Sequence, residues 1–358
     1  MFYKIIIFSI ALIKLPGKKS YFFFYLNLCF IFSLLSQDVH FSQFSMAPLW
    51  LNPAQAGAQH DMRGTANYKS QWGSVAQPYS TANLSWDMRL GKSDKKVLTG
   101  IGININQDQS GSPKIKTFQA ALSYACHIKV SEKSRLGIGL YGAVIQRSIS
   151  YEGLQWMNQY DGLAYNPSLS SKEIKGAMIF FRPDAGAGIH YEYSKNEKFM
   201  TGNDHRKLSA GVSAFHINKP AYSFYGSNEK LYMKFGGYVN AEIGLPNSDL
   251  SLVPGFYYFQ QGPSTELLIG TLMQYKLTGD SKYTGYIQGS TLSFGAYYRV
   301  RDAAIANVLF KFSHYSIGLS YDFNVSNLKT ASKGGGGFEI ALRYVNPNTF
   351  MHKPKERL

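Results

Sequence analysis

The sequence predicts an all-β fold: a transmembrane antiparallel β-barrel of about 14 strands that follows an N-terminal export signal. Three observations predict this fold. The chain opens with apolar runs typical of a signal, and a period of two in hydrophobicity recurs almost to the C-terminus. The candidate strands are about 10 to 14 residues long, with aromatic residues near their ends. The composition agrees, because 26 Tyr, 24 Phe and 34 Gly against 2 Cys favour many strands joined by tight turns.

Residues 1–36 contain two apolar runs, residues 2–15 and residues 21–35, separated by a Pro-Gly-Lys-Lys sequence. The second run has a basic flank, a short apolar stretch and the small residue Ser36, so we expect a Sec-type signal that is cleaved near Ser36. The first run is either an extended n-region or the result of a start codon set too early. Each run is shorter than the roughly 18 apolar residues that anchor a protein in a membrane.

Alternation after the signal is clearest in residues 315–323. Apolar residues occupy one face and small or polar residues the other: Tyr315, Ile317, Leu319, Tyr321 and Phe323 against Ser316, Gly318, Ser320 and Asp322. A soluble β-sandwich would alternate in the same way, so the pattern alone does not identify a membrane barrel. The export signal, the strand length and the aromatic strand ends favour the barrel.

The same alternation divides the rest of the chain into about 14 strands. This number is even, as a closed antiparallel barrel prefers. The strands are expected to begin near Met62, Tyr79, Val97, Ile115, Arg135, Met178, Lys207, Leu231, Asp249, Thr265, Thr284, Ala303, His314 and Gly336. A barrel of this size has an interior too wide for its own side chains to fill. We therefore expect the interior to hold water, a plug or a partner.

The predicted connections differ in length. Residues 109–113 and 262–264 are short and rich in turn residues, whereas residues 151–175 form a long connection. Its candidate contact residues are Trp156, Tyr160, Asp161 and Tyr165. We expect short turns on one side of the membrane and long loops on the other, as in outer-membrane barrels. The long connection folds either inward as a constriction or outward as a contact surface.

The charge distribution narrows the possible partners. The formal net charge is +15, but the basic residues are scattered and form no basic helix or arginine-rich tract. This pattern disfavours nucleic acid as a partner. Outer-membrane lipid headgroups or an acidic protein would use the same charge.

Motifs for cofactors, metals or catalysis are weak. Residues 137–142 match G-x-G-x-x-G, but they lie within an alternating strand, so we interpret the glycines as permitting strand curvature. Residues 334–337 are four glycines that fit a mobile hairpin connection. The histidines lack the spacing of metal ligands. We expect no catalytic residue, no cofactor and no metal ion, and hence a protein that is not an enzyme.

The stretch after the signal combines several unusual residues in order: Gln43-Phe44, Leu51-Asn52-Pro53-Ala54, Ala56-Gly57, Arg63, Gln71-Trp72 and Tyr79. It closely resembles the N-terminal signature of the PorP/SprF family of type IX secretion outer-membrane proteins, known from Bacteroidetes. Beyond Asp87 the likeness rests on strand rhythm, glycine-rich strands and length. The resemblance implies a closed outer-membrane barrel that assists type IX secretion or retains an exported adhesin at the cell surface.

The resemblance also implies partners: a large exported client, bound through its C-terminal sorting domain, and other components of the secretion or gliding machinery. A diffusion porin or small-solute transporter is the alternative. It is motivated by polar positions on the predicted inward face, such as Asn83, Ser85, Asn240 and Ser320. An outer-membrane hydrolase would need a catalytic cluster at one rim, and residue spacing indicates none.

The residues that match the family signature are not assigned catalysis by the family, so we expect structural or partner-contact roles. Asn52-Pro53 would form a turn and Gly57 a special backbone conformation. Arg63 would be an inward charge that needs a carboxylate, and Gln71 would help to hold the entry segment. Trp72 and Asp87 complete the set.

Four parts of the chain are therefore expected. They are the signal (residues 1–36), an N-terminal entry segment that packs at a rim or within the lumen (37–61), the barrel (62–346) and a basic C-terminal tail (347–358).

Overall fold

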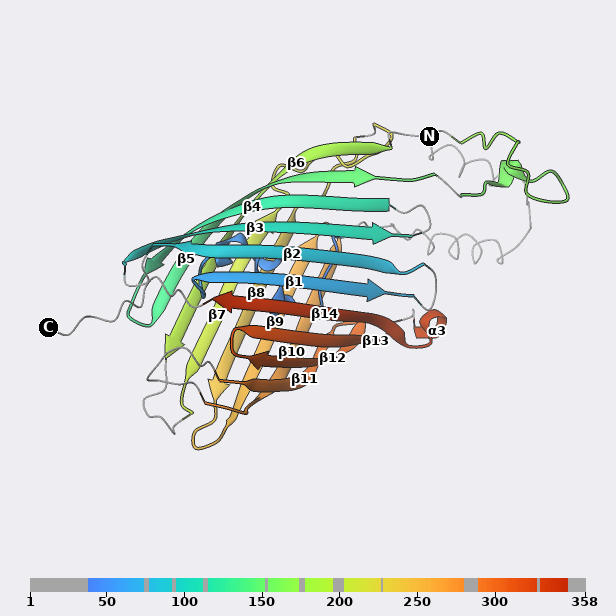
Figure 1. Ribbon diagram of the computed structural model, residues 1–358. Helices are drawn as coiled ribbons and strands as arrows, with labels where there is room; N and C mark the ends of the chain where they lie inside the picture. The colour runs from blue at the N-terminus through green and yellow to red at the C-terminus, as the bar shows by residue number, and fades with distance from the viewer. Residues whose placement is uncertain are drawn as a thin grey trace, which may run out of the picture. The chain divides into compact units, whose positions relative to one another are not determined.

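Fourteen antiparallel strands close into a barrel in the computed structural model (Figure 1). The structure describes residues 38–346 except 74–76, 92–94, 112–114, 152–153, 174–177, 196–202, 227, 280–288 and 327–328. The expected signal and the expected C-terminal tail lie outside the described residues. The strands are β1 (Met62–Gln71), β2 (Tyr79–Leu90), β3 (Val97–Ser110), β4 (Ile115–Lys129), β5 (Ser134–Ser148), β6 (Ile179–Lys195), β7 (Arg206–Phe215), β8 (Lys234–Gly244), β9 (Leu250–Gln261), β10 (Ser264–Lys276), β11 (Thr291–Arg299), β12 (Ala303–Phe312), β13 (Tyr315–Asn324) and β14 (Gly335–Asn346).

Each strand pairs with its neighbours in the chain, and β1 pairs with β14 to close the ring. The closing register runs from Met62 opposite Asn346 to Gln71 opposite Gly337. In the closed ring every strand pairs with a neighbour on both sides, as a barrel in a bilayer requires, and residues 179–186 of β6 extend past its pairing with β7. The predicted fold class is therefore confirmed.

Most strands begin at or next to the expected residue. Two do not. Strand β8 begins at Lys234 instead of Leu231, and β11 begins at Thr291 instead of Thr284, which lies outside the described residues.

The two faces of the wall differ as the alternation predicts. On β13, Tyr315, Ile317, Leu319, Tyr321 and Phe323 are exposed, whereas Ser316, Ser320 and Asp322 are buried. Apolar side chains thus cover the outside and polar ones face the lumen. Within the described residues, no helix has the length and apolar character to cross a membrane.

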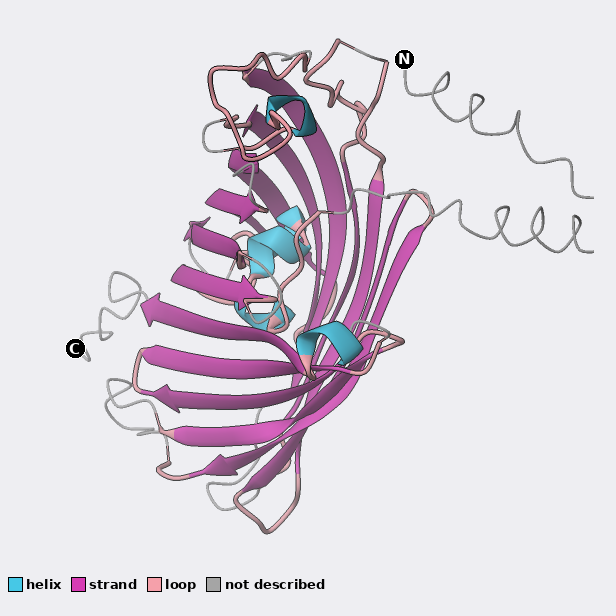
Figure 2. Cartoon of the chain, turned by 90° about the vertical axis from the view of Figure 1, so that its right-hand side faces the viewer, coloured by secondary structure: helices cyan, strands magenta, loops and turns pink. Residues whose placement is uncertain are grey.

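The lumen is occupied by residues 38–58, which we call the lumen segment. Its three short helices, η2 (Phe44–Met46), α2 (Pro48–Leu51) and η3 (Pro53–Gln55), lie inside the ring of strands (Figure 2). The ring of Phe44 packs against Tyr257 and Phe259 at centroid distances of 5.2 and 4.8 Å, and Leu51 belongs to the same buried cluster. The hydrophobic core of the barrel therefore sits in its lumen.

The distribution of loops differs from the prediction. In a ring of consecutive antiparallel strands, every connection that follows an odd-numbered strand lies at the same end. The short connections after β3 and β9 thus share an end with the long ones after β5 (149–178) and β7 (216–233). The expectation of short turns on one side and long loops on the other was wrong. We call this end the long-loop end, and the opposite end is where β1 begins and β14 ends.

The long connection 149–178 contains the short helix η4 (Met157–Gln159) and folds outward, away from the lumen (Figure 2). Its Met157 and Leu163 side chains are 95% and 93% exposed. Of the two courses that the sequence left open, inward and outward, this loop therefore takes the outward one.

The four glycines at 334–337 do not form a hairpin connection as expected. Gly335–Gly337 belong to β14, and only Gly334, with φ of 83°, lies in the turn that follows the helical turn α3 (Lys329–Ser332). Backbone pairing with β1 and β13 overrides the preference of glycine for loops.

Candidate functional site

The lumen segment crosses the barrel from one end to the other. Asp38 lies at the long-loop end, beside His216 and Lys234, which flank the β7–β8 connection. Asp61 lies at the opposite end, where its carboxylate is 2.9 Å from Arg89 Nη1 at the end of β2. Three groups of wall residues hold the segment between these points.

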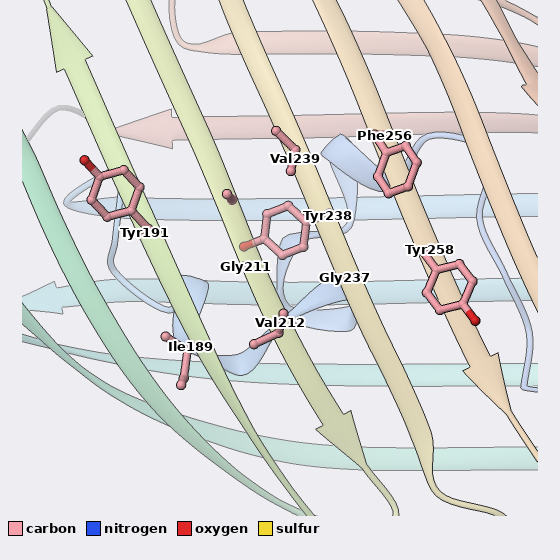
Figure 3. Close-up of a pocket in the computed structure, with 10 residues that line it drawn as sticks. Ile189, Tyr191, Gly211, Val212, Gly237, Tyr238, Val239, Phe256 and Tyr258 are labelled. Atoms are coloured by element: carbon pink, nitrogen blue, oxygen red, sulfur yellow. The ribbon is translucent and has the colours of Figure 1, made fainter.

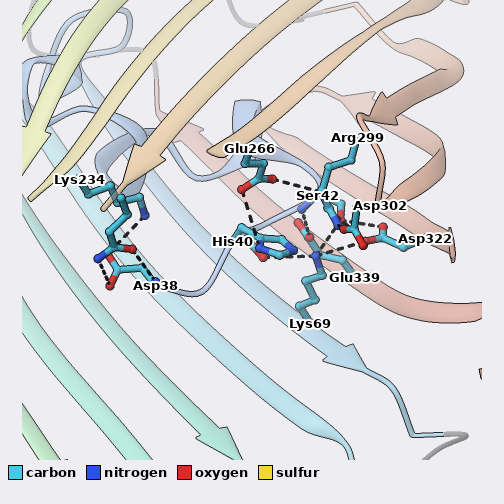
Figure 4. Close-up of polar contacts among 11 residues, drawn as sticks. Asp38, His40, Ser42, Lys69, Lys234, Glu266, Arg299, Asp302, Asp322 and Glu339 are labelled. Carbon is cyan, nitrogen blue, oxygen red and sulfur yellow. Dashed lines mark hydrogen bonds and ion pairs between the residues drawn. The ribbon is translucent and has the colours of Figure 1, made fainter. Parts of the chain in front are cut away.

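The first group binds Asp38 at the long-loop end. Its carboxylate lies 3.5 Å from Lys234 Nζ (Figure 4). It also lies 2.8 Å from His216 Nε2 and accepts a hydrogen bond from Gln261 Nε2 at 3.1 Å. His216 Nδ1 faces the second carboxylate, that of Asp184, at 2.9 Å.

The charges of this group support one another. Burial alone would lower the pKa of His216, but the carboxylates of Asp38 and Asp184 outweigh burial and raise the pKa to about 9. Burial alone would raise the pKa of Asp38, but His216 and Lys234 hold that pKa well below its usual range. At neutral pH the charged groups of Asp38, His216 and Lys234, which we call the latch, therefore fix the start of the lumen segment.

The second group surrounds Ser42 at the seam between β1 and β14 (Figure 4). The Ser42 hydroxyl donates to Asp322 of β13 at 2.7 Å and accepts from Lys69 Nζ of β1 at 2.9 Å. The Glu339 carboxylate of β14 accepts the backbone N–H groups of Ser42 and Gln43.

Buried charges complete this second group. Lys69 Nζ lies 3.3 Å from Asp322, and Arg299 of β11 lies 3.2 Å from the same carboxylate and 3.1 Å from Glu266. The Lys69 side chain has no exposed surface. Because an unpaired buried charge is costly, these residues stabilise the lumen segment only as a complete set.

The third group centres on Asn52 and η3. Asn52 Oδ1 accepts the backbone N–H of Ala54 at 2.8 Å and caps η3, while Pro53 is the first residue of the helix. Asn52 Nδ2 donates to the carbonyls of Ile189 in β6 and Val212 in β7, at 2.9 and 3.0 Å. One fully buried amide thus forms the turn and joins it to the wall.

Gly57 and Arg63 continue this group toward β1. Gly57 has φ of 63°, and its N–H donates to Asp87 Oδ2 at 2.9 Å. The Arg63 guanidinium pairs with the same carboxylate, with Nε 2.8 Å from Oδ1, and also donates to the Gln55 carbonyl at 3.1 Å. Both side chains of the pair are almost fully buried. The carboxylate that Arg63 requires is therefore Asp87.

Glycines in the wall make room for the lumen segment. A Cβ on Gly139 would overlap the backbone of Ala54, and one on Gly188 would overlap the Asn52 amide. Within the G-x-G-x-x-G match, Gly142 instead faces outward, with nothing within 4 Å of its Cβ position. At Gly139 the absent side chain serves contact with η3, whereas sequence suggested only curvature.

Two signature residues lie elsewhere. Gln71 ends β1 at the long-loop end, far along the strand from Arg63, and is opposite Gly337 and Tyr79 in register. Trp72 follows with φ of 56° and packs edge-on against Tyr79 at 5.0 Å. Gln71 was expected to hold the entry segment; Lys69, two residues earlier on the same face, does so instead, by donating to the His40 carbonyl at 3.2 Å.

The candidate loop residues belong to a self-contained turn. Tyr160 and Tyr165 form an isolated antiparallel bridge, and Asp161 Oδ1 accepts the backbone N–H groups of Leu163 and Ala164, each at 2.9 Å. The backbone N–H of Trp156 donates to Gln159 Oε1 at 3.3 Å. These residues lie in a loop outside the ring of strands that encloses the lumen segment, so the two predicted sets do not form one site (Figure 2).

Sequence reasoning missed Asp38 and Ser42 in the lumen segment and most of the residues outside it that hold it: Lys69, Asp184, His216, Lys234, Gln261, Glu266, Arg299 and Glu339. A signal for some of them was present. Lys69, Asp322 and Glu339 occupy inward positions of strands, and charges of both signs on an inward face indicate internal pairing. Across the described ranges, no group of three His, Cys, Asp or Glu side chains is arranged to hold a metal ion.

Several solved barrels are similar to this chain in fold alone. The toluene transporter TbuX of Ralstonia pickettii aligns with a TM-score of 0.43 at 11% identity, over 84% of this chain and 93% of its own. BamA from Haemophilus ducreyi lacking POTRA domains 1–3 aligns with a TM-score of 0.40 at 10% identity, over 80% and 71%. A Pseudomonas aeruginosa FadL homologue aligns with a TM-score of 0.40 at 11% identity, over 79% and 90%.

No curated protein matches the sequence. A family model does: the one described as type IX secretion system membrane protein PorP/SprF matches residues 33–344. This range includes the lumen segment and the three groups of residues that hold it. It also includes every strand, with β14 covered up to residue 344. The chain therefore belongs to the PorP/SprF family of type IX secretion system membrane proteins.

Proposed function

We propose that this barrel binds a large exported surface protein through that protein's C-terminal domain, and that it anchors the client or helps its export without catalysing a reaction. The observation that carries the proposal is that the lumen and the long-loop end of the barrel differ in what they leave accessible. The lumen is filled by residues 38–58, whereas the long-loop end presents exposed apolar side chains. Binding would then take place at the loops and not inside the barrel.

Family membership supplies the setting. The barrel fold and the family place the chain in the outer membrane as part of type IX secretion, with other components of that system as partners. We propose in addition that the exported client is an adhesin-like surface protein.

The loops at the long-loop end are suited to protein contact. Met157, Tyr160 and Leu163 are exposed by 95%, 58% and 93%. The backbone of this turn is satisfied by its own hydrogen bonds, so its apolar side chains remain available to a partner. Nearby, the Arg147 guanidinium lies 4.2 Å from the ring centre of Tyr222 in the 216–233 loop. Aromatic, methionine and arginine side chains are the types enriched at protein interfaces.

The filled lumen weighs against a diffusion porin or small-solute transporter. Of the inward residues that suggested a polar channel, Asn83, Ser85 and Ser320 are only 2–3% exposed and Asn240 is half-buried. Purified protein in planar bilayers should therefore show no steady conductance. A stable open channel from correctly folded protein would favour the porin.

The client is tested by affinity purification of tagged protein from solubilised outer membranes of cells that express the secretion system. One large exported protein should be recovered, and its isolated C-terminal domain should bind the purified barrel. Recovery of no exported protein under these conditions would contradict the proposal.

Paired variants locate the binding surface. A double substitution Met157→Ser and Leu163→Ser should reduce client recovery about tenfold or more, since central apolar contacts at interfaces each contribute more than about 1 kcal/mol. The control is Val130→Ser and Leu277→Ser, two residues exposed by 63% and 50% in connections at the opposite end. Equal loss from both pairs would show that the long-loop end is not the docking surface.

A further inference from the structure

An apolar groove runs over the outer face of strands β6 to β9 (Figure 3). Its volume is about 550 Å³, which falls in the range of about 300–1,000 Å³ typical of small-ligand sites. The lining is apolar or aromatic: Ile189, Tyr191, Ala210, Gly211, Val212, Gly237, Tyr238, Val239, Phe256 and Tyr258.

The groove exists because small residues separate two ridges. Ala210 of β7 lies opposite Tyr191 of β6, and Gly237 of β8 lies opposite Tyr258 of β9. A Cβ on Gly237 would meet nothing within 4 Å, so this residue leaves open space on the outer face. A flexible apolar chain would fit between the ridges, surrounded by bilayer hydrocarbon on its free side.

Two basic residues stand on the same face, toward the opposite end of the barrel. Lys195 and Arg206 face each other directly across β6 and β7. Moving toward the groove, the next outward pair is Tyr193 with Leu208, and the pair after that is Tyr191 with Ala210. Tyrosines at this depth mark the boundary between headgroups and hydrocarbon.

Within the described residues, the two bases have one carboxylate at ion-pair distance between them. Like charges directly opposite each other destabilise a strand pair. The Asp204 carboxylate lies 3.4 Å from Lys195 Nζ, but Arg206 makes no ion pair with any acid in the described residues. An anion placed between the bases would remove the repulsion.

We propose that this face binds one anionic glycerophospholipid. Its headgroup phosphate would lie between Lys195 and Arg206, and an acyl chain would lie along the groove past Ala210 and Gly237. Outer-membrane barrels have their longer loops outside the cell, so the opposite end faces the periplasm. The periplasmic leaflet is the phospholipid leaflet of such a membrane, which matches the position of the bases.

A second groove provides an internal control. It has a volume of about 480 Å³ on strands β2 to β5, and its lining includes Trp86, Leu122 and the open glycine Gly142. Toward the opposite end, the outward residues on its strands form the apolar row Val97, Ile128 and Leu136. This groove should contact lipid chains without selecting a headgroup.

The test measures lipid retained by detergent-purified barrels in native mass spectrometry, after addition of phosphatidylglycerol or phosphatidylcholine. One phosphatidylglycerol should remain bound, with phosphatidylcholine retained much less. Gly237→Leu should displace it, and Gly142→Leu, the matched change in the second groove, should leave it bound. Arg206→Gln with Lys195→Gln should weaken retention by about fivefold for each base removed. Ala210→Leu fills the same groove from β7 if Gly237→Leu does not fold.

Several outcomes would overturn the proposal. Equal loss in the two glycine variants would indicate only general lipid contact. Full retention by the Arg206 and Lys195 variant, or equal retention of the two phospholipids, would remove the headgroup site. Preferential retention of added lipid A would assign the face to the other leaflet. Heat-modifiable migration confirms that each barrel is folded before it is measured.

Discussion

The lumen segment (residues 38–58) and the long loop (149–178) are both irregular stretches with short helices, yet they satisfy their polar groups in opposite ways. Asn52 in the lumen segment binds backbone carbonyls of the wall, at 2.9 and 3.0 Å. Asp161 in the loop binds backbone N–H groups only two and three residues further along. The polar groups of the first region are satisfied by the barrel wall, whereas those of Asp161 are satisfied within its own turn.

This difference suggests which region supports the fold and which meets partners. A segment whose contacts span hundreds of residues is part of the core, so changes there should alter stability. A loop that is satisfied internally and exposes apolar side chains can change without loss of the fold. Four variants test this division.

The largest effect is expected from Arg63→Ala. It leaves the Asp87 carboxylate buried without its ion pair, which costs about 3–5 kcal/mol of unfolding free energy. Urea unfolding of the refolded barrel measures the change. The control is Lys207→Ala, which removes a half-exposed partner of Glu242 and should cost no more than about 1 kcal/mol. Similar losses in the two variants would mean that the lumen contacts do not stabilise the barrel.

A smaller loss is expected from Gly139→Ala, because the added methyl group overlaps the Ala54 backbone and forces η3 to move. Overpacking of this kind costs about 1–3 kcal/mol. Gly142→Ala, three residues along the same strand, faces open space and should be close to neutral. If the two variants unfold at the same urea concentration, η3 does not pack against β5 as described.

The latch at Asp38 should weaken at alkaline pH. The pKa of His216 is about 9 in the folded protein, against an ordinary value of 6.5. Its contribution to stability is therefore complete below pH 6.5 and is lost as pH rises through 9. The difference in unfolding free energy between the protein and a His216→Asn variant should shrink over this window. A difference that stays constant with pH would show that the charged imidazole does not hold Asp38.

The smallest effect on stability is expected from Met157→Ser with Leu163→Ser. Both side chains are more than nine-tenths exposed, so the unfolding free energy should change by no more than about 0.5 kcal/mol. The same variant should lose client binding. A large loss of stability would instead assign the loop to the fold.

Much of the fold could be predicted from sequence because the bilayer imposes a simple rule on each strand. Outward residues must be apolar along a length that spans the membrane, and this rule set the strand starts and their even number. The end at which each short connection lies could not be predicted from its length, since the long connection after β5 and the short one after β9 share an end. The end at which a connection lies depends on whether it follows an odd-numbered or an even-numbered strand.

The contacts of the lumen segment were harder to predict. Asn52, Gly57, Arg63 and Asp87 were visible as a signature close together in the chain. Glu339, which binds the Ser42 amide from 297 residues away, was not. Alternation shows that a residue faces the lumen but not what it meets there, because that depends on the path of another segment through the interior.

The closing pair of strands contacts the lumen segment, and this has a consequence for biogenesis. Ser42 is bound by Lys69 on β1 and by Glu339 on β14. These are the first and last strands of the chain, and their pairing closes the ring. Correct ring closure is therefore coupled to binding of the segment. Its polar groups are satisfied only when the first and last strands are paired in the correct register. A barrel that closed with a slipped seam would leave these charges unpaired in its interior, which gives the correct ring an advantage during insertion.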